Sequence, residues 1–162
     1  MDKVTLKIMT RELCHEFYRG FQNDPDIFMD MSKFFTYQYS KEKVDRYFDE
    51  QQIPTRVVFM IIYNGNPLGE VKLKNIDYQN KVCTLSIHLQ NDSIKGKGVG
   101  TAAEKMALEY AFNKLDINVV NADAVLKNKR SQHVLEKVGF TFVEEDDMFK
   151  YYTCKRQDII HL

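Results

Sequence analysis

The spacing of hydrophobic residues changes along the chain between the alternation typical of strands and the three-and-four spacing typical of helices. Residues 4–8 alternate and predict a first strand, and residues 11–21 predict a helix with Thr10 as its N-cap. One or two further helices are expected over residues 26–35 and 41–51.

The middle of the chain carries apolar, strand-like runs at residues 56–63, 68–76 and 81–89. Residues 64–67, with the sequence Asn-Gly-Asn-Pro, and residues 77–80 supply short turns between them. Strands joined by turns this short pair with their neighbours in the chain, so an antiparallel meander is expected.

The rest of the chain predicts a helix over residues 102–115, beginning near Gly98, and then a strand at residues 119–126. A helix over residues 129–139 and two strands with a turn near Asp146 follow. The order of elements is thus mixed α/β. The helix after Gly98 is expected to bury one face, formed by Val99, Ala103, Met106, Ala107 and Tyr110.

Composition limits the class of protein. A chain of 162 residues that is 44% hydrophobic can form one globular domain with a substantial core. The formal net charge is zero, so neither nucleic acid nor a membrane surface is an expected partner. No apolar run reaches the roughly 20 residues that span a bilayer, and the first residues do not begin a signal peptide, so a cytoplasmic location is expected. Cys14, Cys83 and Cys154 are odd in number and widely spaced, which favours buried reduced thiols over disulfides or a zinc site.

The strongest chemical signal is the run Ile-Lys-Gly-Lys-Gly-Val-Gly-Thr at residues 94–101, directly before the predicted helix. Glycines at 96, 98 and 100 allow backbone N–H groups to turn toward one point. The helix N-terminus adds a partial positive charge, so an anion is the expected ligand. The run therefore predicts a phosphate or pyrophosphate site.

The spacing within this run excludes two common phosphate-binding motifs. It lacks the Gly-Lys-Ser/Thr ending of the nucleotide triphosphatase loop, and its G-x-G-x-G order differs from the dinucleotide fingerprint G-x-G-x-x-G. With Lys95 in the leading position, it resembles the [RQ]-x-x-G-x-[GA] acyl-CoA loop of the GCN5-related N-acetyltransferase (GNAT) superfamily. Lys95 departs from the usual Arg or Gln.

Other segments carry the same resemblance. Residues 127–140, Lys-Asn-Lys-Arg-Ser-Gln-His-Val-Leu-Glu-Lys-Val-Gly-Phe, are similar to the superfamily signature N-x-x-S-x-x-[VL]-[YL]-x-K-x-G-F. Residues 74–89, with an Asn-Ile-Asp turn before a strand, resemble the RimJ/RimL-like branch, which acetylates ribosomal proteins, as do residues 6–13 and 23–26. The similarity extends over nearly the whole chain.

The resemblance implies a fold and a reaction. It implies a single GNAT-like domain over residues 1–162, with a central, mostly antiparallel, twisted sheet of about six to seven strands flanked by about four helices. It implies direct transfer of an acetyl group from acetyl-CoA, without a metal, to a primary amine of a protein N-terminus, a polyamine or an amino sugar. Many members of the superfamily dimerise, so a homodimer is among the expected states. The implied cofactor-binding residues are Ile87, Leu89, Lys95, Gly96, Lys97, Gly98, Val99, Gly100, Thr101, Asn128 and Ser131.

Catalytic residues are harder to assign. Many relatives use a Tyr where this chain has Leu135, so the resemblance points to Ser131 as the group that assists the leaving thiolate. Glu70 and His88 are the candidate bases, since each lies on a predicted strand of the central meander. Each candidate also has a structural explanation: Asn128 can simply cap a helix, and a lone strand His is often a hydrogen-bonding core residue.

Several charged and aromatic groups have two interpretations. Lys97, Lys127, Lys129 and Arg130 are either solvated or lie beside the CoA phosphates. Residues 144–147 form an acidic cluster that is either a solvated turn or an attractor for a cationic amine. The aromatic-rich segment 28–39 either covers the acceptor or packs into the core. Two other functions stay open: a non-catalytic acyl-CoA-binding or regulatory module, and a nucleotide-binding protein.

Overall fold

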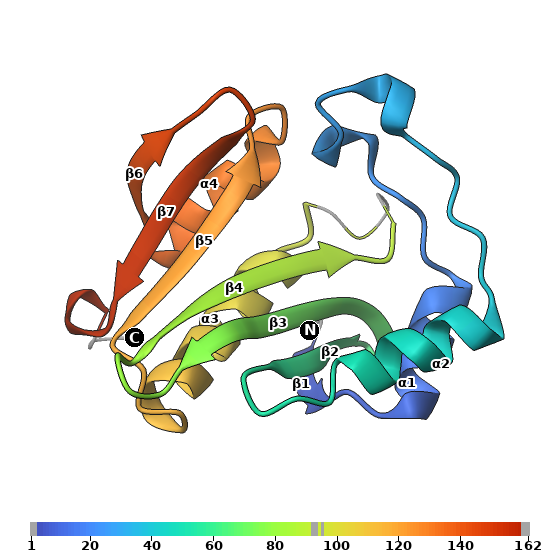
Figure 1. Ribbon diagram of the computed structural model, residues 1–162, viewed down its shortest axis with the longest axis horizontal. Coiled ribbons are helices and arrows are strands. Elements are labelled where there is room, and N and C mark those ends of the chain that lie inside the picture. Colours follow the sequence, from blue (N-terminus) through green and yellow to red (C-terminus); the bar gives the residue numbers. More distant parts are fainter. Residues whose placement is uncertain (1–2, 92–93, 95, 160–162) are drawn as a thin grey trace.

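The computed structural model describes residues 3–91, 94 and 96–159, and its strands form one seven-stranded sheet (Figure 1). In chain order the helices and strands are β1 (Val4–Ile8), α1 (Arg11–Arg19), η1 (Pro25–Ile27), η2 (Met31–Lys33), α2 (Lys41–Glu50), β2 (Val57–Tyr63), β3 (Asn66–Asp77), β4 (Val82–Leu89), α3 (Val99–Asn113), β5 (Val119–Val125), α4 (Lys129–Val138), β6 (Thr141–Glu145), β7 (Phe149–Lys155) and η4 (Arg156–Asp158).

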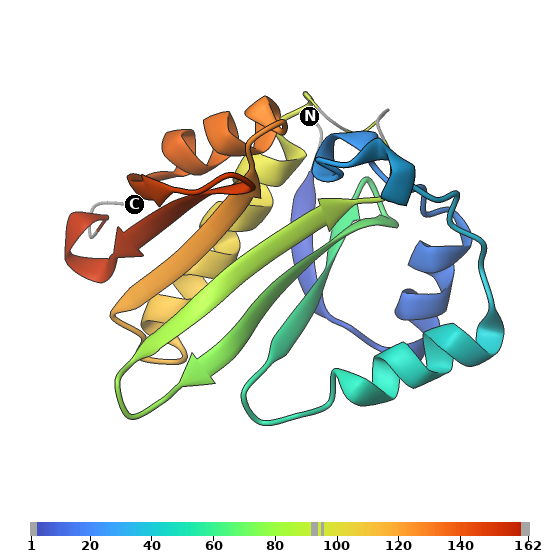
Figure 2. The same cartoon turned by 45° about the horizontal axis from the view of Figure 1, so that its top comes forward.

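The sheet order is β1-β2-β3-β4-β5-β7-β6, which confirms the predicted meander and the mostly antiparallel sheet. Among the described strands, β4 and β5 are the one parallel pair. Their pairing runs only from Val82 opposite Val119 to Thr84 opposite Asn121. Beyond these residues the two strands separate, and Figure 2 shows the gap widening toward their C-terminal ends. This gap positions the candidate site.

Helices cover both faces of the sheet. In β2, Val58, Met60 and Ile62 pack against α1 and α2. The alternating residues Phe59, Ile61 and Tyr63 belong to the larger core formed with α3 and α4. Because side chains alternate across a strand, a strand covered on both faces is apolar throughout, which explains the continuous apolar run in the sequence. No helix in the described part of the chain is long and apolar enough to cross a membrane.

The hairpin between β2 and β3 turns at Asn64 and Gly65, whose φ angles are 50° and 88°. Asn and Gly adopt positive φ more readily than other residues, so this turn has the expected chemistry.

Cys14, Cys83 and Cys154 are free and buried, as expected. Burial raises the pKa of Cys14 and of Cys83 to about 12.

The prediction of a helix over residues 26–35 is wrong. The segment instead forms two single turns, η1 and η2. The side chains of Asp24 and Asp30 accept hydrogen bonds from the backbone N–H groups of Asp26 and Ser32, at 2.8 and 3.0 Å. Such short side-chain bonds compete with helix formation, and this explains why the helical spacing did not give a helix.

The buried face of α3 is only partly as expected. Val99, Ala103 and Ala107 are buried, whereas Met106 and Tyr110 are half-buried. Contact with both the sheet and α4 widens the covered stripe. The other buried residues of α3 are Glu104, Leu108, Ala111 and Phe112.

Candidate functional site

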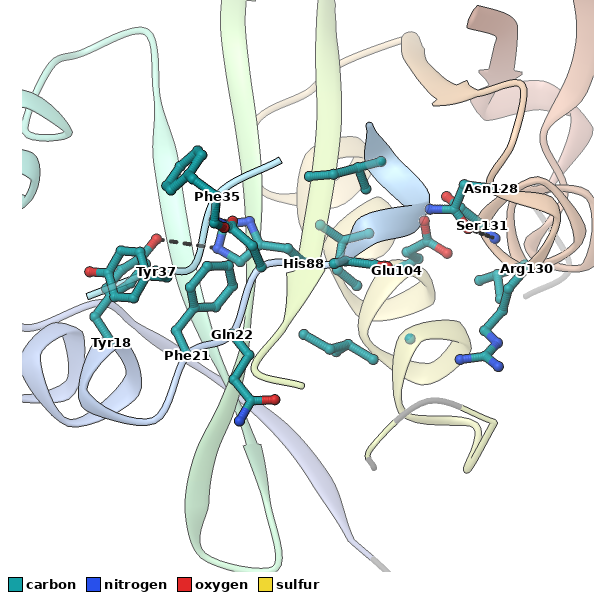
Figure 3. Close-up of a pocket in the computed structure, with 17 residues that line it drawn as sticks. Tyr18, Phe21, Gln22, Phe35, Tyr37, His88, Glu104, Asn128, Arg130 and Ser131 are labelled. Carbon is teal, nitrogen blue, oxygen red and sulfur yellow. Dashed lines mark hydrogen bonds between the residues drawn. The ribbon is translucent and has the colours of Figure 1, made fainter. Parts of the chain in front are cut away.

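A cavity of about 410 Å³ lies where β4 and β5 separate. The end of β4, the start of α3 and the start of α4 contribute to its wall, together with α1 and the segment around η1 (Figure 3). A smaller cavity of about 160 Å³ lies beside it, between β4 and β5. Ile27, Ile87, Glu104, Asn128 and Ser131 line both, so the two cavities adjoin.

The glycine run forms the beginning of α3. Gly96 and Gly98 have φ angles of 79° and 78°, which residues other than glycine rarely adopt. The first intrahelical bond joins the Ala102 N–H to the Gly98 carbonyl at 3.1 Å, and Gly98 has no side chain to cap the helix. The N–H groups ahead of Ala102 therefore have no partner within the helix and can bind an anion.

Space around the run is open. A Cβ atom at Gly96, Gly98 or Gly100 would meet nothing within 4 Å, and Gly100 itself lines the larger cavity. Val99 is buried in the core and does not line either cavity. Within the run, Lys97 is exposed, and Thr101 is half-buried in the first turn of α3. Lys95 lies outside the described residues.

The last residues of β4 supply a free strand edge. Ile87 and Leu89 line the cavity, and β3 pairs with β4 on one side as far as Leu89. On the other side, the described part of β5 does not pair with β4 beyond Thr84. Backbone groups along such an edge can bind an extended molecule that carries amide groups, as an added strand would.

His88 and Glu70 lie opposite each other on paired strands, and Tyr18 connects them. The Tyr18 hydroxyl donates to Glu70 Oε2 at 2.9 Å and lies 3.2 Å from His88 Nε2. Tyr47 donates to the other Glu70 oxygen. Because the single Tyr18 proton goes to Glu70, His88 Nε2 is assigned as the donor to Tyr18, and Nδ1 carries the lone pair.

The structure separates the two candidate bases. His88 lines the cavity, whereas Glu70 is 1% exposed and lies behind Tyr18. Desolvation lowers the pKa of His88 despite the opposing charge of Glu70. The rings of Phe17 and Phe21 pack within 5.7 and 5.3 Å of the imidazole centroid, and the rest of the side chain, 42% of its surface, is exposed. His88 is therefore neutral at pH 7 and can accept a proton.

The tyrosines of this network stay protonated. Burial, followed by the charge of Glu70, raises the pKa of Tyr18 and also that of Tyr47. Neither tyrosine is among the site residues predicted from the sequence. Nothing in the helical pattern of residues 11–21 or 41–51 distinguishes these tyrosines from ordinary core aromatics.

Asn128 and Ser131 lie at the start of α4, across the cavity from His88 in Figure 3. The Asn128 side chain accepts a hydrogen bond from the Ser131 N–H at 3.1 Å, so the capping interpretation of Asn128 is confirmed. Asn128 also lines both cavities, and Ser131 is half-buried there. Leu135, where many relatives have Tyr, is buried and lines only the smaller of these two cavities.

The other charged residues predicted to lie near the ligand are the basic residues around the start of α4 and the acidic cluster at residues 144–147. Lys127 Nζ donates to the carbonyls of Pro25 and Phe28 at 3.2 and 3.4 Å, which ties the η1 segment to the start of α4. Arg130 lines the cavity and Lys129 is exposed. In the acidic cluster, Asp146 accepts from the Met148 and Phe149 N–H groups and from the Tyr151 hydroxyl on β7, and none of residues 144–147 lines the cavity.

The aromatic-rich segment 28–39 forms part of the cavity wall. Phe35 and Tyr37 line the cavity, although Phe35 is 58% exposed. Tyr37 also packs against Tyr18 and Phe21. The segment thus joins the cavity to the smaller core cluster.

Among the described residues, no three His, Cys, Asp or Glu side chains are grouped so that they could hold a metal ion.

Two curated relatives share part of the sequence. The putative ribosomal N-acetyltransferase YdaF of Bacillus subtilis (strain 168) is 32% identical over 80 residues, which are 49% of this chain and 43% of YdaF. The spermidine N(1)-acetyltransferase of Escherichia coli (strain K12) is 27% identical over 94 residues, 58% of this chain and 50% of that protein. The chain therefore spans about half the length of these relatives. Their names differ in acceptor, so the RimJ/RimL-like branch stays a prediction.

Solved structures share the fold over almost the full length. A chimera of Vibrio cholerae spermidine N-acetyltransferase SpeG and hSSAT has a TM-score of 0.76 at 16% identity, over 98% of this chain and 99% of that one. AAC(6')-Ib in complex with ribostamycin and coenzyme A has a TM-score of 0.75 at 20% identity, over 98% and 97%. At these identities the likeness establishes the fold alone.

The family itself is established by sequence. The family model described as "Acetyltransferase (GNAT) domain" matches residues 3–141, a range that runs from β1 past the end of α4. It includes the parting strands β4 and β5, the glycine run and the capped start of α4. Because the match covers most of the chain and every segment that forms the cavity wall, the chain belongs to the GNAT family of acetyltransferases.

Proposed function

We propose that the protein is an acetyl-CoA-dependent N-acetyltransferase that transfers an acetyl group to a primary amine by direct attack in a ternary complex. The observation that carries the proposal is the meeting of two features at one cavity. The uncapped N-terminus of α3 opens beside it, and the unpaired edge of β4 runs along it. The first suits a pyrophosphate, and the second suits the amide-bearing pantetheine arm.

The cavity has room and suitable groups for a second substrate beside the thioester. Tyr18, Phe21, Phe35 and Tyr37 form an aromatic wall on the side away from α4. Aromatic faces accommodate the alkyl part of an amine and attract a cationic nitrogen. A peptide N-terminus, a polyamine or an amino sugar carries the required nitrogen, and relatives named for ribosomal protein and spermidine acetylation support the first two classes.

Acetyl-CoA supplies the activated acetyl group, and the residues of the chain handle protons and position. His88 accepts a proton from the incoming ammonium, since only the neutral amine attacks a carbonyl carbon. Backbone N–H groups at the end of β4 orient the thioester and stabilise negative charge on its oxygen. When the carbon–sulfur bond breaks, the Ser131 hydroxyl donates a hydrogen bond or relays a proton through water to the sulfur.

A panel of amines tests the proposal. Release of the CoA thiol is measured with N-terminal peptides, spermidine and related polyamines, aminoglycosides and nucleotide amino sugars, each against a reaction without acceptor. We expect acceptor-dependent thiol release with at least one of these classes. Absence of release throughout the panel, in a protein shown to bind acetyl-CoA, would instead favour a non-catalytic acyl-CoA-binding module.

Replacement of Ser131 by Ala is expected to lower kcat by roughly 10- to 100-fold and to leave the KM for acetyl-CoA nearly unchanged. The hydroxyl acts on the leaving sulfur, whereas the cap of α4 uses the Ser131 backbone N–H and survives the substitution. Steady-state kinetics with both substrates varied measures the two parameters. A variant with normal kcat would remove Ser131 from the reaction.

A further inference from the structure

Glu104 is an unusual residue for its position. It lies in the second turn of α3, within the helix face that packs into the core, and is 1% exposed. The other buried residues of α3 are all apolar. Glu104 lines both the larger and the smaller cavity, so its side chain lies at the junction beneath the gap between β4 and β5 (Figure 3).

One carboxyl oxygen of Glu104, Oε2, is buried without a partner in the described part of the chain. Leaving such a polar atom unsatisfied costs roughly 1–3 kcal/mol, so a native protein rarely retains one without a use. Desolvation raises the pKa of Glu104 to about 8, and at neutral pH the group is therefore a neutral acid with one O–H to donate.

We propose that Glu104 is a positioning residue for the acyl-CoA arm and donates a hydrogen bond to a carbonyl oxygen of that arm where it passes between β4 and β5. This inference rests on the function proposed above. Asn128 and Ser131 line the same two cavities as Glu104, and Ile87 lies on the opposite wall at the free edge of β4. An arm in this gap would thus meet backbone groups on one side and the Glu104 acid on the other.

Three proteins separate this role from a structural one: the wild type, Glu104→Gln and Glu104→Leu. Glutamine keeps a neutral donor of the same length, whereas leucine keeps the burial and removes the donor. At pH 7 we expect the Kd of acetyl-CoA by calorimetry to stay within about threefold for Glu104→Gln and to rise about tenfold for Glu104→Leu, the effect of one lost hydrogen bond. Glu109→Gln, on the exposed side of the same helix, is the matched control.

Stability is expected to change in the opposite direction. Leucine at position 104 removes an unsatisfied buried acid, so the melting temperature of the ligand-free protein should rise while its acetyl-CoA affinity falls. A residue that served only to hold the fold would lose stability and affinity together. Loss of both in Glu104→Leu, with unchanged binding in Glu104→Gln at every pH, would overturn the proposal.

The pH dependence of binding gives an independent test that needs no leucine variant. Above pH 8 the wild-type carboxyl ionises and no longer donates, so its Kd should rise relative to that of Glu104→Gln, which cannot ionise. Comparing the two proteins cancels the ionisation of CoA and the contribution of the other charged or titratable groups that face the cavities, namely Asp24, His88, Asp123, Arg130 and the tyrosines 18 and 37. Parallel curves overturn the proposal, and a wild type that does not bind acetyl-CoA contradicts the proposed function instead.

Discussion

Gly100→Leu is expected to raise the KM for acetyl-CoA by roughly 100-fold and to change the acceptor KM little, since one or two charge-assisted hydrogen bonds worth about 1.5–3 kcal/mol each are lost. Gly100 lies in the first turn of α3 and lines the cavity, and a Cβ atom there enters open space. The variant is therefore expected to fold without a clash, and its leucine side chain occupies the space expected for the anionic part of the ligand. Kinetics with each substrate varied, and calorimetry with CoA, measure the effect.

The glycine at 98 offers a second variant with a matched control. Gly98 and Gly65 both have positive φ, at 78° and 88°, and a Cβ atom at either position would enter open space. Alanine at either position carries a similar backbone strain of about 1–2 kcal/mol. We expect only Gly98→Ala to weaken CoA binding, because Gly98 is the N-cap of α3, two residues before the cavity-lining Gly100, whereas Gly65 lies in the distant β2–β3 turn. Unchanged CoA affinity in Gly100→Leu would exclude the glycine run from the binding site.

Local signals in the sequence predicted local structure well. Asn128, Gly98 and the Asn64–Gly65 turn act on backbone groups within a few residues, so their chemistry could be predicted without knowing the fold. The strands of the meander were equally clear because short turns leave few alternatives for pairing. The GNAT resemblance then ordered these segments and pointed to the α4 start as part of one site with the glycine run.

Contacts between distant residues could not be predicted. The bond from Tyr18 to Glu70 joins residues 52 positions apart, and the contact of Tyr18 with His88 joins residues 70 apart. Whether a strand residue faces the cavity depends on the register of the sheet, which pairs Glu70 with His88. The alternation of apolar and polar residues along each strand gave no indication that Tyr18 would cover Glu70.

Burial of polar residues was the other source of error. Glu104 is buried within the apolar stripe of α3 although the helical pattern did not include it, whereas Met106 and Tyr110, which the pattern selected as core residues, are half-buried. In residues 26–35 the apolar spacing is helical, but aspartates at 24 and 30 bond to nearby backbone N–H groups. In both cases polar side chains overrode a pattern that is based on hydrophobic residues alone.

His88→Gln is expected to lower kcat by roughly 100- to 10,000-fold, the usual contribution of a general base, with little change in the KM for acetyl-CoA. Glutamine retains an N–H that can donate to Tyr18, so the network around Glu70 is preserved, but it cannot accept the proton of the ammonium. His133→Gln is the matched control, because His133 is exposed on α4 and does not line the cavity. A kcat within threefold of the wild type would exclude His88 as the base.

The pH profile tests the same assignment through the buried carboxylate. The activity of the wild type should fall as the pH drops through the pKa of His88, which desolvation places below the ordinary value near 6.5. The charge of Glu70 raises that pKa, so Glu70→Gln should move the acidic limb to still lower pH. The amide of the variant keeps one oxygen that accepts from Tyr18 or Tyr47, in place of the two carboxylate oxygens that accept from both. A limb that stays in place would mean that another group titrates. A limb that shifts in Glu70→Gln and disappears in His88→Gln would identify His88 as the base and Glu70, acting across Tyr18, as the residue that sets its working pH.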